Sequence, residues 1–398
     1  MIRSIQNNFI FFFLLVVALS PSLVSTSLKN IYAYFLMMLI IIMLFLSKEV
    51  KNRNIAIVYG VSFFLIPVPA IFNTILHQEI DITTVLFTSF RFMFLGVCFF
   101  TLCKYSSMYR GNGTYKLLRL FIVLNFVIIL LGYISPSFNN AIFFLYYNQE
   151  SYDEFYAYML GRPGGLLGNP NTLAMSMVFV LLFFLPQSLN IKFRYVYIIL
   201  IVLIILITKS RTGLFGLTLG LSCYFVLMRR LDAFLYFMIL IGFSIILGGL
   251  LGYLDVNELI ERYITDVDLS GRDSLWIEIL RNPFFSDNYL LGTLTIPEGF
   301  NAVDNEYLNI LVRYGVIGLV VFLLSNFFAA IYYLYLFSIN VKNEMAALSI
   351  TCIFVFLVFC LAGSPLTSLK LCFVYLTVLS FFTSKSLEYY NESISYGA

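Results

Sequence analysis

The sequence predicts an all-α, polytopic membrane protein with about twelve transmembrane helices and two long loops at the outer face. Of its 398 residues, 61% are hydrophobic and 11% are charged, whereas a soluble domain carries about 25% charged residues. A chain with so few charges cannot cover a water-facing surface, so its excess apolar residues must face lipid. We therefore treat residues 1–398 as one integral membrane domain.

Apolar segments of spanning or near-spanning length follow one another along the chain, given that about 20 residues cross a bilayer. The seventh segment is short, and we expect it to extend into its flanks. The first follows Arg3 as a signal peptide would, but no clean cleavage site follows it, so we interpret it as an anchor. The segments are 8–24, 30–47, 55–76, 83–103, 117–136, 171–186, 195–208, 213–231, 233–252, 313–338, 344–363 and 366–384.

The loops between these segments alternate in charge. One set is short and basic, and the positive-inside rule assigns it to the cytoplasm together with both termini. The opposite side carries 16 of the 21 acidic residues. All twelve segments satisfy this single alternation. The basic set holds 14 of the 24 Lys and Arg residues: Arg3, Lys48, Lys51, Arg53, Lys104, Arg110, Lys116, Arg119, Lys192, Arg194, Arg229, Arg230, Lys342 and Lys385.

Two of the outer loops are long, covering about residues 137–170 and 253–312. The second is polar and amphipathic, contains the only Trp, and has room for two or three short helices. Transporters usually have short loops and carry their chemistry in the middle of the membrane, within matched repeats. This chain has no convincing internal repeat, and its polar residues gather at the outer face instead.

Neither the cysteines nor the histidine predicts a cofactor or metal site. The six cysteines fall inside apolar segments without metal-ligand spacing. His77 is the only histidine, so a zinc site or a His-based triad lacks a second one. Asp266 and Asp268 imitate the DxD motif of nucleotide-sugar glycosyltransferases, but they lie on the outer side, where nucleotide sugars are absent. We expect no metal, no cofactor and no nucleic-acid partner.

A glycine-rich segment, Gly161–Asn171, stands where the first long loop re-enters the membrane. Its four glycines in eight residues allow a tight backbone that exposes N–H groups. Asn169 followed by Pro170 predicts a helix N-cap with proline at the first helical position. A helix N-terminus beside Arg162 is a candidate phosphate-binding position. The alternative is a flexible hinge leading into the membrane.

Two further arginines lie in or near the membrane. Lys209–Gly213 is a polar break between two apolar segments at the outer surface. An arginine at such a boundary is costly unless it snorkels or binds something, so Arg211 either binds a ligand or reaches the lipid headgroups. Arg91 lies inside the fourth segment, and we expect it to face the bundle interior or a water-filled cavity and to pair with an acid.

The large outer loop carries two more polar segments. Gly271–Trp276 predicts the start of a helix with Arg272 in its first turn. Asp304 and Glu306 then precede the tenth apolar segment, which contains Arg313. Either acid is a candidate general base, and the alternative for each is a solvated or helix-capping carboxylate. Because arginine binds phosphate through a bidentate fork, composition and position alone predict a membrane protein that binds anions at its outer face.

These segments, in this order and on this topology, resemble the O-antigen ligase/polymerase superfamily of bacterial envelope glycosyltransferases. The resemblance covers about residues 155–320, and the preceding segments fit by number and length only. Each motif is weak alone, whereas the ordered set is fairly specific. The matching residues are Arg162, Gly165, Asn169, Pro170, Asn171, Ser210, Arg211, Gly271, Arg272, Trp276, Asp304, Asn305, Leu308, Gly315 and Gly318.

The resemblance implies a multi-pass protein of the bacterial cytoplasmic membrane that acts on glycans carried by undecaprenyl pyrophosphate. It implies a metal-independent, inverting glycosyl transfer at the outer face. Arg211 and Arg272 would hold the donor pyrophosphate and stabilise it as it leaves, which is a large catalytic effect. Arg162 would assist or hold the pyrophosphate of the acceptor lipid. The other expected substrate-binding residues are Arg313, Asn169, Asn171 and Asn305.

The superfamily has two branches that matter here. Ligases, which move finished polymer onto lipid A core, carry a histidine before the Asn of the large loop, where this chain has Asp304. The departure favours the Wzy-type polymerase branch, which joins repeat units of O-antigen or capsule, with a chain-length regulator and a flippase as partners. It leaves the general base open between Asp304 and Glu306. The alternatives are a ligase and a lipid-linked oligosaccharide flippase; only Arg91 and the segment count favour a flippase.

Overall fold

The structure is a computed structural model that describes residues 54–76, 82–108, 112–146, 162–189, 191–250, 272–282, 288–294, 305–339 and 343–397. The first two expected membrane segments, 8–24 and 30–47, lie outside these residues. So do His77, the pair Asp266 and Asp268, and Asp304. For Arg272 the structure gives the helix position but not the side-chain surroundings.

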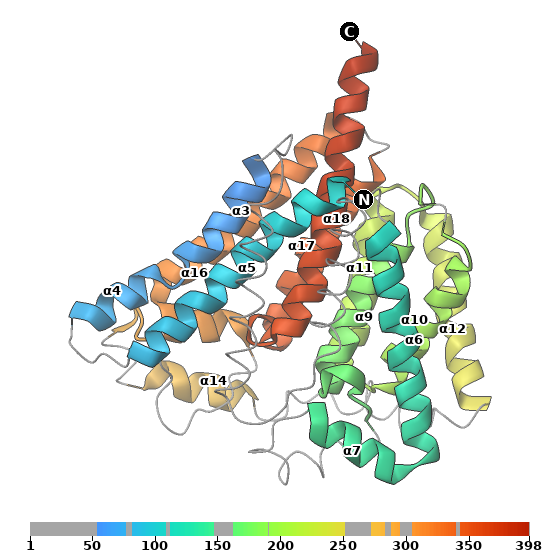
Figure 1. Ribbon diagram of the computed structural model, residues 1–398, viewed down its shortest axis with the longest axis horizontal. Coiled ribbons are helices and arrows are strands. Elements are labelled where there is room, and N and C mark those ends of the chain that lie inside the picture. The colour runs from blue at the N-terminus through green and yellow to red at the C-terminus, as the bar shows by residue number, and fades with distance from the viewer. Residues whose placement is uncertain are drawn as a thin grey trace, which may run out of the picture.

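The described chain is all α-helical, and each expected apolar segment from 55 to 384 coincides with helix. Figure 1 labels the helices from the N-terminus in blue to the C-terminus in red. Two short 3-10 turns, η2 (Gly165–Leu167) and η4 (Pro365–Thr367), connect some of them. The helices are α3 (Asn54–Leu65), α4 (Val68–Leu76), α5 (Ile82–Met108), α6 (Asn112–Ile134), α7 (Pro136–Tyr146), α9 (Pro170–Phe184), α10 (Arg194–Ile207), α11 (Arg211–Leu227), α12 (Leu231–Leu250), α14 (Arg272–Arg281), α16 (Glu306–Ile339), α17 (Glu344–Ala362) and α18 (Leu369–Gly397).

Five segments of the described chain are long and apolar enough to cross a membrane, which makes this an integral membrane protein. They are Val58–Leu76, Thr114–Ile134, Glu306–Ile339, Glu344–Ala362 and Lys370–Asn391. Other apolar helices, including α9, α10 and α11, have 10–17 residues. The loop expected at 137–170 contains α7, and the loop expected at 253–312 contains α14 and the first turns of α16.

Two segments differ from the expectation in an instructive way. Segment 55–76 is divided into α3 and α4 around Pro67, because proline lacks the N–H that a continuous helix needs. Segment 195–208 does not extend into its flanks. The helix α10 is preceded by Phe193, with φ 59°, and is followed by Lys209, with φ 50°. These left-handed residues end the helix on both sides, so the expected extension was wrong.

Helices α17 and α18 lie at the centre of the bundle. In Figure 1 they stand between a group formed by α3, α4, α5 and α16 and a group formed by α6 and α9 to α12. Helix α18 packs against α5, α9 and α17, and α17 also packs against α11 and α16. Accordingly, 89% of the Lys370–Asn391 window is buried within the protein, compared with 33% of the Thr114–Ile134 window.

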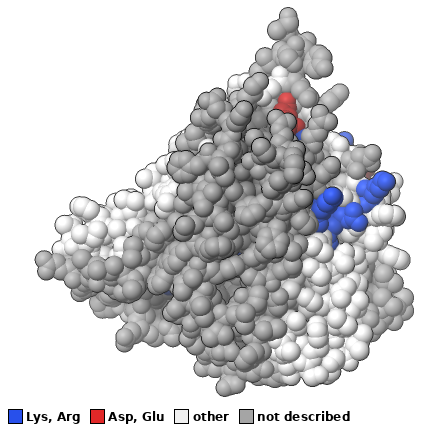
Figure 2. Space-filling view, in the orientation of Figure 1, with Lys and Arg blue, Asp and Glu red and all other residues white. Residues whose placement is uncertain are grey.

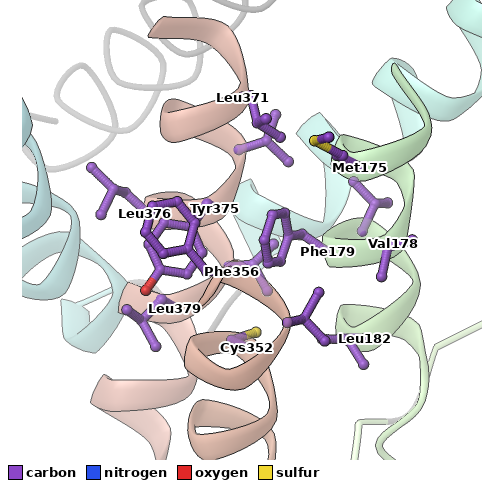
Figure 3. Close-up of a cluster of buried hydrophobic side chains, with 14 of the residues drawn as sticks. Met175, Val178, Phe179, Leu182, Cys352, Phe356, Leu371, Tyr375, Leu376 and Leu379 are labelled. Carbon is purple, nitrogen blue, oxygen red and sulfur yellow. The ribbon is translucent and has the colours of Figure 1, made fainter. Parts of the chain in front are cut away.

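Aromatic rings fill the centre of the bundle (Figure 3). The rings of Phe356 and Tyr375 are stacked, with centroids 4.2 Å apart, and Phe179 from α9 lies 5.1 Å from Tyr375. The Tyr375 hydroxyl meets that of Tyr59 at 2.9 Å, and Tyr59 donates to Asn326 Oδ1 at 2.8 Å. Because lipid gives apolar helices no hydrophobic drive to associate, close packing and interhelical hydrogen bonds of this kind hold the bundle together.

Basic loop residues gather at one end of the bundle, which we call the basic end, although Glu344 and Glu388 also lie there. There the Tyr115 hydroxyl donates to the Lys192 carbonyl, and Arg230 donates to Gln187. Arg119 lies 5.1 Å from the ring centroids of both Tyr115 and Tyr197. In Figure 2 the blue side chains gather in the upper right, above a broad uncharged surface. This grouping is the arrangement that the alternating loop charges predict.

Candidate functional site

The glycine-rich segment folds into a compact turn at the opposite end of the bundle. The η2 turn is anchored by Asn125, a fully buried residue of α6 whose Oδ1 accepts from the Leu166 N–H at 3.0 Å. Gly165 has φ 53°, and a Cβ there would lie 2.3 Å from the same Oδ1 atom. The Leu167 and Gly168 N–H groups donate within the turn. The expectation that this segment exposes its N–H groups was therefore wrong at these three positions.

Arg162 connects this turn to two other helix ends. Its Nε donates to the Thr208 carbonyl at 3.1 Å and its Nη2 donates to Asn171 Oδ1 at 3.0 Å. The Ser210 hydroxyl donates to the same Asn171 oxygen at 2.9 Å. We call these four residues the Arg162 cluster. Asn171 thereby joins two motif segments that lie 39 residues apart in the sequence.

Arg162 is 6% exposed, so its guanidinium works mainly inside the protein. It ties the end of α10 to the start of α9, which is a positioning role. Asn169 caps α9 by accepting from the Asn171 and Thr172 N–H groups, and Pro170 follows it, as the sequence predicted. These contacts show that Arg162, Asn169 and Asn171 have structural roles. The sequence alone had predicted such a role only for Asn169.

Arg211 stands at the first position of α11, directly after its N-cap. The Ser210 hydroxyl caps the helix by accepting from the Gly213 N–H at 3.2 Å. A cation at this position opposes the helix dipole by about 0.3–1 kcal/mol, so helix stability does not explain it. A helix N-terminus with an adjacent guanidinium instead suits an anion. Arg272 occupies the equivalent first position of α14.

A second group, the Glu306 cluster, forms where α16 begins. Glu306 is 1% exposed. Its Oε2 accepts from the Leu366 N–H at 2.8 Å and its Oε1 accepts from Asn309 Nδ2 at 2.9 Å. Asn309 Oδ1 in turn accepts from Arg313 Nε at 2.9 Å. The Leu366 carbonyl accepts from Arg91 Nη2. One carboxylate therefore orients two arginines, each through one intermediate residue.

The partner of Arg91 corrects one expectation from the sequence. Arg91 does not form an ion pair with an acid among the described residues; it donates to the Leu366 carbonyl. Glu306 accepts from the N–H of the same residue. The carboxylate is therefore linked to Arg91 through the backbone of Leu366 and not by a direct contact. Through this bond Arg91 reaches the α17–α18 connection, and its side chain is partly buried.

Arg313 is fixed from a third direction by the segment 288–294. Its Nη1 donates to the Leu294 carbonyl at 3.3 Å, and its own carbonyl accepts from the Leu294 N–H at 2.8 Å. Immediately afterwards α16 is kinked at Gly315, with φ 68° and ψ −178°. A Cβ at Gly315 would lie 2.4 Å from the Leu290 carbonyl oxygen. Only glycine fits here, because both the dihedral angle and the close approach exclude a side chain.

The connection between α17 and α18 lies between the two clusters. On one side Leu366 contacts Glu306 and Arg91. On the other side Lys370 Nζ donates to the Leu166 carbonyl of the glycine turn at 2.9 Å. Four segments that are far apart in the sequence thus meet at one end of the bundle: the glycine turn, α5 at Arg91, the start of α16 and the α17–α18 connection. The Asn305 side chain caps α16 by accepting from the Leu308 N–H at 3.1 Å.

Sequence analysis did not single out Asn125, Leu366 or Lys370. For Asn125 a signal was available, since an amide inside an otherwise apolar membrane segment is costly unless it is hydrogen-bonded. For Leu366 there was none, because its backbone rather than its side chain takes part. Asp304, the first-named candidate base, lies outside the described residues. Its neighbour Glu306 is buried and has both carboxylate oxygens engaged.

The arrangement concentrates arginine at the end of the bundle opposite the basic end. Arg211 and Arg272 open their helices, while Arg91 and Arg313 are oriented by Glu306. Guanidinium groups bind phosphate through paired hydrogen bonds and keep their charge at any working pH. This end of the protein is therefore chemically suited to groups that bear phosphate. In comparisons with known proteins, the chain matches no family model and no curated protein sequence.

Proposed function

We propose that this protein is a polysaccharide polymerase that joins oligosaccharide repeat units carried on undecaprenyl pyrophosphate at the outer face of the bacterial cytoplasmic membrane. The observation that carries the proposal is the Asn171 oxygen, which accepts from both Arg162 and Ser210. It brings together two of the motif segments on which the resemblance to the O-antigen ligase/polymerase superfamily rests. Ser210 in turn directly precedes Arg211.

The proposal includes a membrane topology. The chain crosses the bilayer twelve times, with both termini and the basic end in the cytoplasm. The Arg162 cluster and the Glu306 cluster lie at the outer face. The grouping of Lys192, Arg194 and Arg230 at one end of the described helices supports this orientation. Lipid-linked repeats delivered by a flippase then reach the clusters from the outer leaflet, and a chain-length regulator acts with the polymerase.

The proposed reaction is an inverting glycosyl transfer without a metal ion. A hydroxyl of the acceptor repeat attacks the anomeric carbon of the donor, and the bond from that carbon to the pyrophosphate oxygen breaks. Arg211 and Arg272 stabilise the charge that develops on the departing undecaprenyl pyrophosphate. The proton of the acceptor hydroxyl passes to Asp304. Glu306 is the poorer candidate base, since its two oxygens already accept from Leu366 and Asn309.

The arginine roles can be tested in a reconstituted assay with lipid-linked repeats. Arg211→Lys and Arg272→Lys keep a charge that can snorkel but lose the bidentate fork. We expect each to lower polymerisation about 100-fold or more, as the loss of a donor to a developing oxyanion does elsewhere. Arg281→Lys, at the exposed far end of α14, is the matched control and should retain activity. Full activity in both of the first two variants would reject the role.

The base is tested in the same assay. Asp304→Asn should abolish polymerisation, because a positioned base typically contributes about 10²–10⁴-fold. The wild type should polymerise equally with and without a chelator. An Asp304→Asn variant that works at the native rate would remove Asp304 from the mechanism.

The product that accumulates in a deletion strain separates the three candidate functions. A polymerase defect leaves surface glycan with one repeat unit and no ladder. Loss of a ligase would strand long polymer on the carrier lipid, and loss of a flippase would trap single repeats at the cytoplasmic side. Either of the last two patterns would replace the proposed function by the corresponding alternative.

A further inference from the structure

Arg91 and Arg313 come from different helices but share one organiser. Leu366 and Asn309 each donate to a different oxygen of the Glu306 carboxylate, and each accepts from one of the two guanidinium groups. The two guanidinium groups and the carboxylate are within electrostatic range of one another. With Glu306 ionised, two guanidinium groups and one carboxylate give the described part of this cluster a net charge of one positive unit. An excess charge at the membrane boundary is costly unless a counter-charge meets it.

The hydrogen bonds that fix the two arginines leave donors available. Arg313 uses Nε and Nη1 on Asn309 and Leu294, and Arg91 uses Nη2 on Leu366. Within the described residues, no hydrogen bond engages Nη2 of Arg313 or Nη1 of Arg91. Guanidinium groups held on one side by protein acceptors, with donors left on the other, are preorganised for an oxyanion. Arg162 differs, because it is 6% exposed and ties two helix ends together.

We propose that Arg91 and Arg313 form a second phosphate-binding position, oriented by Glu306, that receives the pyrophosphate of the acceptor lipid. This inference rests on the proposed function, since a polymerase must hold two lipid-linked pyrophosphates at once. It moves the acceptor position from Arg162 to the Glu306 cluster. Glu306 is then a positioning residue, which acts on the ligand through the two arginines and does not touch it.

The separation of the two positions follows from the fold. Arg211 belongs to the α9–α11 group of helices, while Arg91 and Arg313 belong to the α3–α5–α16 group. The α17–α18 connection lies between them and contacts both, through Lys370 on one side and Leu366 on the other. Two pyrophosphates held in this way are kept apart by protein, while their glycans extend outward from the same end of the bundle.

The test is equilibrium binding of undecaprenyl pyrophosphate, without sugar, to the full-length protein in nanodiscs of zwitterionic lipid. We expect two equivalents to bind the wild type. Arg91→Lys and Arg313→Lys should weaken one of the two binding events about tenfold, which corresponds to the loss of one charge-assisted hydrogen bond. Glu306→Gln should weaken the same binding event by a similar factor. The glutamine amide has one acceptor oxygen, so it cannot replace both hydrogen bonds that Glu306 accepts from Leu366 and Asn309.

Glu344→Gln is the matched control, since Glu344 is also buried at the start of a helix but lies at the basic end. It should bind two equivalents with native affinity; equal weakening in Glu306→Gln and Glu344→Gln would overturn the positioning role. A single equivalent in the wild type, or native affinity in both Lys variants, would overturn the second position. So would loss of the second equivalent when anionic phospholipid replaces zwitterionic lipid, because a bilayer headgroup would then be the occupant.

Polymer formation by the wild type is measured on the same nanodisc preparation after lipid-linked repeats are added. Absence of polymer would reject the proposed function. Native binding in the Lys variants would reject only the second phosphate position, so the two failures are distinguishable.

Discussion

Two buried glutamates begin helices at opposite ends of this protein, and their surroundings differ. Glu344, at the start of α17, accepts from the Ser188 hydroxyl at 2.9 Å, from the Gln187 and Ser188 N–H groups, and from the Tyr224 hydroxyl. Glu306, at the start of α16, accepts from one N–H and one amide, which in turn orient two arginines.

The difference separates a structural carboxylate from an organising one. At the basic end all donors to Glu344 are uncharged, and they come from two segments, which the carboxylate ties to the start of α17. At the opposite end the two partners of the Glu306 carboxylate each also accept from a guanidinium group, so the carboxylate orients Arg91 and Arg313. A buried acid at a helix start is therefore not informative by itself. Both partners of Glu306 accept from a guanidinium group, whereas among the partners of Glu344 only Gln187 does, from Arg230.

The largest effect should follow from Gly315→Ala, which acts on the Glu306 end only. The left-handed φ and the 2.4 Å approach to Leu290 should lower the free energy of unfolding by about 3 kcal/mol, the upper end for a strained backbone position. Unfolding by SDS in mixed micelles measures this. Amide exchange should also increase at Leu294 and Val316, whose N–H groups bond across the kink.

Gly242→Ala is the control for that substitution, because a Cβ at Gly242 in α12 meets nothing within 4 Å. Its unfolding free energy should be unchanged or slightly higher, since alanine favours helix. Equal losses in the two variants would show that the kink at Gly315 carries no special strain.

An intermediate effect is expected from Tyr224→Phe at the basic end. The change removes one hydrogen bond to a buried carboxylate and should cost about 1–2 kcal/mol of unfolding free energy. Binding of undecaprenyl pyrophosphate should stay at the native level, in contrast to Glu306→Gln. A Tyr224→Phe variant that is fully stable but binds poorly would reverse the assignment of the two ends.

The smallest effect should come from Lys385→Ala. Lys385 forms an ion pair with Glu388, three residues later in α18, and Glu388 is 38% exposed. Pairs of this kind contribute about 0–1 kcal/mol and are screened by salt. We expect a change within about 0.5 kcal/mol in the same SDS titration, with no change in binding. A loss as large as that in Tyr224→Phe would mean that the pair is shielded from solvent in the membrane-embedded protein.

The helix positions were predictable from the sequence because apolar length is a local property. Asn169 with Pro170 predicted a helix start, and Gly271–Trp276 predicted another. The ends that depend on backbone dihedral angles, such as those at Phe193 and Lys209, were not predictable, since neither residue type favours a positive φ. The division at Pro67 could have been predicted from the proline itself.

The candidate site was predictable as a set of arginines but not as two clusters. Sequence order places Arg162 beside Asn171, yet nothing in it indicates that Thr208 and Ser210 complete the same group. The link from Arg91 to Glu306 passes through the backbone of Leu366, which any residue type would provide. Contacts made by main-chain atoms between distant segments leave no trace in the pattern of side chains.

The kink at Gly315 has a consequence for the bilayer around the protein. It divides α16 into a short first part, which packs against Ile279 and Trp276 of α14, and a longer apolar part. Membrane helices respond to a thinner or thicker bilayer by changing their tilt. The longer part is bonded to the segment that holds Arg313, because the Val316 and Ile317 N–H groups donate to the Tyr289 and Leu290 carbonyls. We therefore expect a change in bilayer thickness that tilts the longer part to reach Arg313 through this segment.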